Sequence, residues 1–219
     1  MNATVIYSDR KTVSIQVKRD GSVTVHAPAG MSRARINELL EQRAGWIAKH
    51  QAAQGEREEL TEVYYLGKPY PVKRTDEKKV GFDGESFILP EGADRAQSVD
   101  ALSVFFKAVG KKYMAAKTAY WASVMRLPAP PPPKITGAKT RWGSCGGKGG
   151  NRINYSYMLM MADEGCVDYV TVHELSHIRY KNHNEDFYAQ VAAILPDYKA
   201  REERLRGYER IFTKKGFYD

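Results

Sequence analysis

Apolar and polar residues alternate along the first third of the chain, which is the pattern of strands buried on one face. Residues 12–18 are polar and apolar by turns, Asp20 and Gly21 carry a strong turn signal, and residues 22–26 resume the alternation. This pattern predicts a hairpin. Further short runs predict a second hairpin and a strand that follows it, at residues 63–66, 70–73 and 87–89.

Elsewhere the apolar residues recur at intervals of three and four, as in amphipathic helices. Ser32 is a suitable N-cap for a helix that ends near Gly55, and a long helix is predicted from about residue 97 to 126, with Gly110 as a weak point. Five prolines between residues 128 and 133 predict a stiff extended connector.

Beyond the connector, two strands are expected around a glycine-rich turn, and helices follow. The strands are residues 134–136 and 151–157, the turn is Gly143 to Gly150, and the last helices begin near Glu164, Phe187 and Tyr198. The order of elements predicts an α+β protein. We place a boundary between a β-rich region with one helix, residues 1–93, and a second domain, residues 94–219.

Composition narrows the class of protein. The chain has 219 residues, of which 42% are hydrophobic and 27% are charged, so it is expected to fold around a substantial core. It contains no apolar run of about 20 residues, so we expect no membrane-spanning helix. The charged N-terminus does not match a signal peptide, and Cys145 and Cys166 form no C-x-x-C pattern. We therefore expect a cytoplasmic protein with reduced thiols.

The formal net charge is +8, which favours anionic partners without specifying a site. The most basic segment is the helix from Tyr198 to Tyr208, but Glu202 and Glu203 lie within it. Two interpretations stay open for this helix: weak nucleic-acid association through a basic surface, or an ordinary solvated face.

The strongest chemical signal is the pattern H-E-x-x-H, formed by His173, Glu174 and His177. On a helix, His177 lies about 40° around from His173 and one turn along, so both imidazoles can reach one metal ion. Glu174 lies about 60° from His177, close enough to act on a water bound to that ion without being a ligand. The spacing predicts a zinc site with a separate general base.

A third ligand is needed, and His183 is the candidate. On an unbroken helix it would lie about 9 Å beyond His177 and about 120° around the axis, too far for a Zn–N bond of about 2.1 Å. The chain must turn first. Lys181 and Asn182 are residues typical of a helix end, so we predict a stop there that returns His183 to the ion.

Zinc with three protein ligands keeps a position for water and can polarise a carbonyl, whereas structural zinc sites are usually closed by four ligands. The pattern therefore favours a hydrolase with a zinc-activated water. Two alternatives stay open: a zinc-dependent nucleotide or phosphoanhydride hydrolase, and a basic nucleic-acid-associated zinc protein. Cys145 as a nucleophile is disfavoured, because no separate base is evident for it.

Several segments together resemble the YgjP-like family of predicted metal-dependent hydrolases, which is related to the minimal zincin peptidases of the WLM and SprT-like groups. They are residues 141–145 (Arg-Trp-Gly-Ser-Cys), 152–154 (Arg-Ile-Asn), 172–177 (Val-His-Glu-Leu-Ser-His) and 182–183, with Phe187. The resemblance implies a minimal zincin-like catalytic domain, Zn²⁺ held by His173, His177 and His183, and Glu174 as general acid and base. It implies a peptide or protein substrate.

Two further expectations concern the surroundings of the zinc site. In zincin-like folds a strand beside the catalytic helix commonly pairs with an extended substrate, and we assign this role to the strand at 151–157. Gly143 and Trp142 are interpreted as a tight structural turn and its buried anchor. Oligomeric state, and the residue that would stabilise an oxyanion, are not indicated by the sequence.

Overall fold

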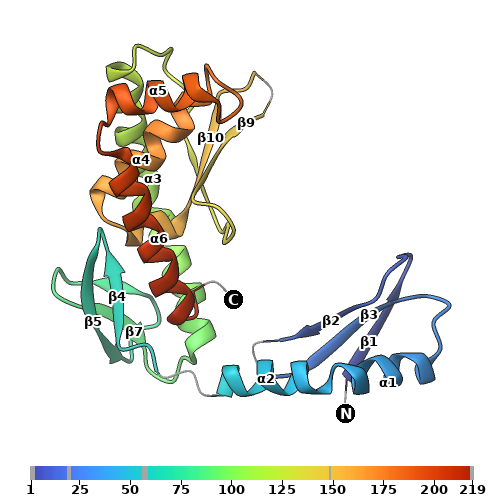
Figure 1. Ribbon diagram of the computed structural model, residues 1–219. Coiled ribbons are helices and arrows are strands. Elements are labelled where there is room, and N and C mark those ends of the chain that lie inside the picture. Colours follow the sequence, from blue (N-terminus) through green and yellow to red (C-terminus); the bar gives the residue numbers. More distant parts are fainter. Residues whose placement is uncertain (1–2, 19–20, 56–58, 148, 218–219) are drawn as a thin grey trace. The chain divides into compact units, whose positions relative to one another are not determined.

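The computed structural model describes residues 3–18, 21–55, 59–147 and 149–217 (Figure 1). The chain divides into two compact units between Glu59 and Leu60, and each has its own hydrophobic core. This division lies earlier than the boundary expected between residues 93 and 94. Residues of the intervening segment, among them Val63 and Phe87, belong to the same buried cluster as the C-terminal helices.

The N-terminal unit contains a three-stranded sheet in the order β1 (Ala3–Ser8), β3 (Val23–Pro28), β2 (Ser14–Val17). Strands β2 and β3 are antiparallel, which confirms the first predicted hairpin, although its turn residue Asp20 lies outside the described residues. Strand β1 was not predicted from the sequence and pairs in parallel with β3, with Ala3 opposite Val23.

Two helices complete this unit, where the sequence pattern predicted one. Ser32 caps α1 (Arg33–Gln42) by accepting a hydrogen bond from the Arg35 backbone amide, as predicted. The helix then ends at Arg43, whose φ of −103° and ψ of 8° are not helical, and α2 (Ala44–Gly55) follows. The core of the unit consists of residues from β3, α1 and α2: Val23, Val25, Ala27, Ile36, Leu40 and Ile47.

The C-terminal unit begins with a four-stranded sheet in the order β4-β5-β7-β6. Its strands are β4 (Glu62–Tyr65), β5 (Lys68–Thr75), β6 (Gly81–Phe82) and β7 (Phe87–Pro90). Strands β4 and β5 form the second predicted hairpin, and β7 pairs in parallel with β5.

The tip of the β4–β5 hairpin contacts the segment that leads into the helix Glu164–Ser176. Leu66 and Gly67 have φ of 46° and 82°, and their backbone amides donate to the carbonyl oxygens of Met160 and Met161 at 2.9 and 3.3 Å. Those carbonyls belong to a short 3-10 helix, η1 (Tyr157–Met161). The hairpin therefore contacts the segment that precedes this helix and belongs to the same compact unit.

A second sheet has the order β8 (Lys134–Thr136), β10 (Arg152–Ser156), β9 (Gly143–Gly146). The two predicted strands are present, but the predicted glycine-rich turn begins with an additional strand, β9, which pairs antiparallel with β10. The turn itself is shorter, and Gly147 and Gly150 lie in it with positive φ. Strand β10 is central in this sheet, and β9 is an edge strand.

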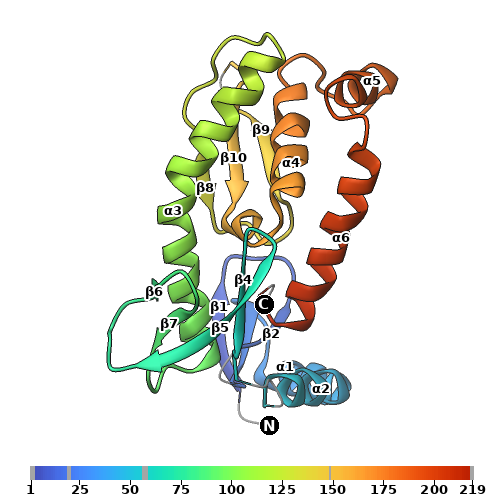
Figure 2. The same cartoon turned by 90° about the vertical axis from the view of Figure 1, so that its left-hand side faces the viewer.

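Four helices belong to the same unit: α3 (Arg95–Val124), α4 (Glu164–Ser176), α5 (Glu185–Ile194) and α6 (Tyr198–Lys214). Helices α3 and α4 contact the strands β8 and β9, respectively, and α5 and α6 pack on α4. Figure 2 shows α3 and α4 side by side against the sheet and α6 alongside α4. Helix α3 continues through Gly110 without a break. The absence of a side chain there lets Met160 approach, since a Cβ at Gly110 would lie 3.1 Å from the Met160 Cγ. The unit is thus an α+β arrangement, as expected. No described helix is long and apolar enough to cross a bilayer.

Candidate metal centre

The H-E-x-x-H residues lie at the C-terminal end of α4. Asp163 caps the start of this helix by accepting from the Cys166 backbone amide, and most α4 side chains are buried because α3, α5, α6 and β9 all pack on it. A helix buried on nearly all sides has little freedom to rotate or shift. The last turn of α4 carries His173 and Glu174, and His177 is its C-cap residue.

The helix ends earlier than the stop predicted at Lys181 and Asn182. Its last residue is Ser176, whose carbonyl oxygen accepts from the Tyr180 backbone amide at 2.9 Å as the chain turns away. The Lys181 ammonium donates to the His177 carbonyl at 2.8 Å and to the Gly150 carbonyl at 3.0 Å. Lys181 therefore donates to a carbonyl at the end of the helix, as its position in the sequence suggested. It does so from the segment that follows the helix and not from within the last helical turn.

This turn returns His183 to the helix end, just before Asn184 caps α5 by accepting from the Phe187 amide at 3.1 Å. The imidazole nitrogens of His173, His177 and His183 lie within 4.8 Å of one another, and the Nε2 atoms of His173 and His183 are 3.0 Å apart. The structure thus brings together the three histidines that the sequence singled out.

The donor set fits a single zinc ion. With Zn–N bonds of about 2.0–2.1 Å, two ligand nitrogens of a tetrahedral ion lie about 3.4 Å apart. The 3.0 Å between the Nε2 atoms of His173 and His183 is close to this value, and the third ligand atom lies within 4.8 Å of both. The Nδ1 atom of His177 lies 3.0 Å from the Tyr180 carbonyl oxygen, which makes Nδ1 the protonated nitrogen and leaves Nε2 free as a ligand. This backbone carbonyl could not be recognised from the sequence, because it depends on the turn.

One aromatic side chain packs against all three histidines of the cluster. Phe187, at the start of α5, is fully buried, and its ring centroid lies 4.9, 4.7 and 4.8 Å from those of His173, His177 and His183. Packing against one rigid ring restricts the orientations of all three imidazoles.

Burial also affects the protonation of two of these residues, His173 and His177. It lowers the pKa of His173 to about 3, with further lowering from the neighbouring charges of His177 and His183. Burial lowers the pKa of His177 as well, against the effect of its bond to the Tyr180 carbonyl. Neutral imidazoles are the form that binds a metal, so these two residues need not lose a proton near neutral pH before they bind one.

The carboxyl group of Glu174 lies beside the cluster in an apolar setting. The residue is 5% exposed, and its Oε2 atom has no hydrogen-bond partner among the described residues. Burial raises the pKa of Glu174 to about 8, and the charge of Arg141 opposes this rise. A buried carboxyl without a partner is costly in free energy, which is typical of a functional group.

Comparison with protein families identifies the family of this chain. A family model described as the YgjP-like metallopeptidase domain matches residues 11–208, which is most of the chain. The chain belongs to the YgjP-like family. This confirms the resemblance seen in the sequence and assigns the chain to a family of metal-dependent hydrolases. Comparisons with curated proteins and with solved structures gave no match.

The Arg-Trp-Gly-Ser-Cys segment of this YgjP-like chain leads into β9 and continues along it, so it is a strand where a turn was expected. The Trp142 ring lies edge-on to Phe212 of α6 at 6.2 Å, so it packs on the core, but it is partly buried and not the buried anchor that was predicted. Both cysteines are free, and burial raises the pKa of the Cys145 thiol, with a further rise from the charge of Glu174. A raised pKa disfavours a thiolate nucleophile.

Four residues whose side chains can donate hydrogen bonds to an oxyanion, Arg141, Arg152, Tyr155 and Tyr180, have different surroundings in this YgjP-like chain. Tyr155 is fully buried, and its hydroxyl lies 3.1 Å from that of Thr118, which makes it a core residue. Arg152 is exposed in β10. Arg141 is exposed just before β9, and its charge acts on Glu174. The Tyr180 backbone carbonyl lies 3.0 Å from His177 Nδ1.

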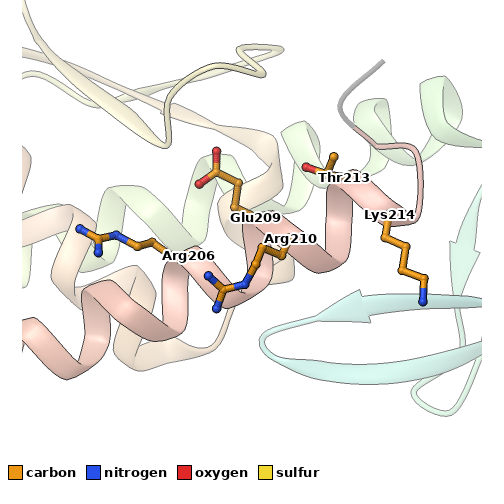
Figure 3. A pocket seen from close by; sticks show the side chains of 5 residues that line it. All are labelled: Arg206, Glu209, Arg210, Thr213 and Lys214. Atoms are coloured by element: carbon orange, nitrogen blue, oxygen red, sulfur yellow. The ribbon is translucent and has the colours of Figure 1, made fainter. Parts of the chain in front are cut away.

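The basic helix of this YgjP-like chain carries a shallow hollow of about 580 Å³, away from the metal centre (Figure 3). All the side chains that line it come from α6: Arg206, Glu209, Arg210, Thr213 and Lys214. Arg206 pairs with Glu202 at 3.1 Å, and Arg210 pairs with Glu203 at 3.3 Å. These ion pairs neutralise much of the local charge, so the observed contacts favour the solvated-face interpretation of the helix.

Proposed function

We propose that this chain is a zinc metallopeptidase in which His173, His177 and His183 bind the ion and Glu174 is the general base and acid. The observation that carries the proposal is the convergence of three imidazoles, two of them held neutral by burial, next to a buried carboxyl group without a partner. The family assignment supports peptide bonds as the substrate class.

When bound, zinc would lower the pKa of a water molecule toward about 7 and polarise the scissile carbonyl. The charge of a bound zinc ion would favour the ionised form of Glu174, against the burial that raises its pKa. The Glu174 carboxylate would then accept a proton from the attacking water and deliver it to the leaving amine nitrogen as the C–N bond breaks. The buried position of the Glu174 side chain keeps bulk water away from its carboxylate, so the proton would pass between substrate and carboxylate.

The strand order changes the expected site of substrate pairing. Strand β10, which contains most of the segment first assigned to this role, has neighbours on both sides, so it offers no free edge. Strand β9 lies at the edge of the sheet and contacts α4. We therefore assign substrate pairing to β9, where an extended peptide could add one more strand by main-chain hydrogen bonds.

The test is Glu174→Gln in zinc-loaded protein. The amide keeps the size of the side chain but cannot accept the proton, so casein hydrolysis should fall by about 10²–10⁴-fold while zinc content is unchanged. The matched control is His173→Ala, which should lose both zinc and activity. Undiminished turnover in a fully metallated Glu174→Gln variant would eliminate the mechanism.

The same assay should include a nucleoside triphosphate with and without chelator, because phosphoanhydride hydrolysis was the main alternative. The glycine-rich segment is a hairpin turn between β9 and β10, and it does not precede a helix as a phosphate-binding loop does. We expect zinc-dependent release of peptides and no zinc-dependent release of phosphate.

A further inference from the structure

A steric relation links the Arg-Trp-Gly-Ser-Cys segment to the metal centre. Gly143 is the first residue of β9, and a Cβ atom built on it would lie 2.6 Å from Glu174 Oε1, 2.7 Å from Cγ and 2.9 Å from Cδ. Contacts this short essentially never occur for real Cβ atoms. The Glu174 carboxylate therefore occupies the volume that any side chain at position 143 would need.

The reason for glycine here is space and not backbone conformation. Gly143 does not have a positive φ, in contrast to Gly147 in the turn that follows β9. Its strand could accommodate an ordinary residue if the Glu174 side chain were absent. The interpretation of Gly143 as a tight-turn residue is thus replaced by one in which it contacts the candidate base.

Neither partner has room to move away. On the strand side, Gly143 pairs with the fully buried Tyr155, and the Trp142 carbonyl accepts from the Ser156 amide at 2.8 Å. On the helix side, Glu174 is 5% exposed and lies in the last turn of a helix packed on nearly all sides. An added methyl group would have to displace the carboxylate or separate β9 from α4.

We propose that Gly143 is a positioning residue for Glu174: the absence of a side chain at 143 forms the slot in which the Glu174 carboxylate is held beside the three histidines. The catalytic consequence rests on the proposed function, whereas the steric coupling between positions 143 and 174 does not. The same glycine places the candidate base directly against the edge strand assigned to substrate pairing.

The steric part is tested by a double-mutant cycle in thermal stability, measured in the presence of chelator so that zinc makes no contribution. Gly143→Ala should lower the Tm by about 2–10 °C, the range expected when a methyl group is forced into a packed site. In a Glu174→Ala background the same substitution should change the Tm by less than about 1 °C, because the colliding atoms are gone.

Gly146→Ala is the matched control. It lies in the same strand, and nothing is within 4 Å of its built Cβ, so its effect on the Tm should be small in both backgrounds. If Gly143→Ala alone failed to fold but Gly143→Ala in the Glu174→Ala background folded, this result would also support the coupling. Equal losses in the two backgrounds, or failure of both Gly143→Ala proteins to fold, would overturn it.

The positioning part is tested in zinc-loaded protein with casein as the probe. Gly143→Ala should keep its zinc stoichiometry and its KM but lose about 10²-fold in kcat, as expected for a misplaced catalytic group. The loss should be smaller in a Glu174→Asp background, where the side chain is one methylene shorter. An unchanged kcat, or a loss of activity that follows a loss of zinc, would overturn the positioning role.

The failure of the proposed function gives a different result. If the zinc-loaded wild-type protein cleaves no casein while the stability cycle shows coupling, the peptidase assignment is contradicted and the steric relation between Gly143 and Glu174 stands.

Discussion

Phe187 illustrates how much of the candidate metal centre depends on a residue outside the proposed ligand set. Its buried ring contacts all three imidazoles, so it limits their rotation and keeps one side of the cluster apolar. Residues that orient the ligands commonly affect metal affinity by about 10–100-fold. The volume of the Phe187 ring is therefore expected to matter for zinc binding as well as for packing.

Phe187→Ala tests this role. Loss of the ring should cost about 3–5 kcal/mol of unfolding free energy and weaken zinc binding by about 10-fold or more, measured by denaturant unfolding and by competition with a chromophoric chelator. Phe106→Ala is the control, because Phe106 is equally buried but lies on α3. It should lose similar stability with unchanged zinc affinity. Equal zinc affinities in the two variants would contradict the role of Phe187.

At the scale of elements, the start of the metal-binding helix depends on a hairpin that is distant in sequence. A Cβ on Gly67 would lie 2.6 Å from the Cβ of Asp163, the N-cap of α4, and 2.9 Å from the Tyr208 hydroxyl of α6. The hairpin tip thus approaches the cap so closely that only glycine fits, and its positive φ adds a second reason for glycine.

Gly67→Ala should therefore destabilise the C-terminal unit by about 2–4 kcal/mol, from strain at positive φ together with steric overlap at the cap. Gly92→Ala separates the two causes: its φ is 76°, yet no atom lies within 4 Å of its built Cβ. Denaturant unfolding should show a loss of only about 1–2 kcal/mol for Gly92→Ala. Similar losses at the two positions would mean that the close approach contributes nothing.

At the scale of the whole molecule, the two units have separate cores, and all three candidate ligands lie in the C-terminal one. A ligand stabilises only the folding unit that binds it, by about 4 kcal/mol at a free concentration 1,000 times its Kd. Zinc is therefore expected to act on one unit of this chain and not on the other.

Calorimetry of the full chain, with and without chelator, measures this directly. Removal of zinc should lower the Tm of the C-terminal unit by about 8–16 °C and leave the transition of the N-terminal unit unchanged. A fragment that starts at Leu60 shows which transition belongs to the C-terminal unit. The substitution His173→Ala should abolish the response of that transition to zinc. A single transition that shifts as a whole would contradict independent units.

Local features of the fold followed from the sequence, and features that depend on distant pairing did not. The Ser32 cap, the two hairpins and the start of α4 at Glu164 were predicted, because each depends on residues adjacent in the chain. Strand β1 was missed because it pairs in parallel with β3, and β2 lies between the two in the sequence. Strand β9 was hidden by its glycines, which are typical of turns.

For the candidate site, the sequence by itself determined the spacing of His173, Glu174 and His177, because the periodicity of a helix converts separation along the chain into a shared face. Only the tertiary structure decided where α4 ends, how His183 returns to it, which strand has a free edge and why position 143 is glycine. These features depend on contacts between segments that lie far apart in the chain, and local periodicity carries no information about such contacts.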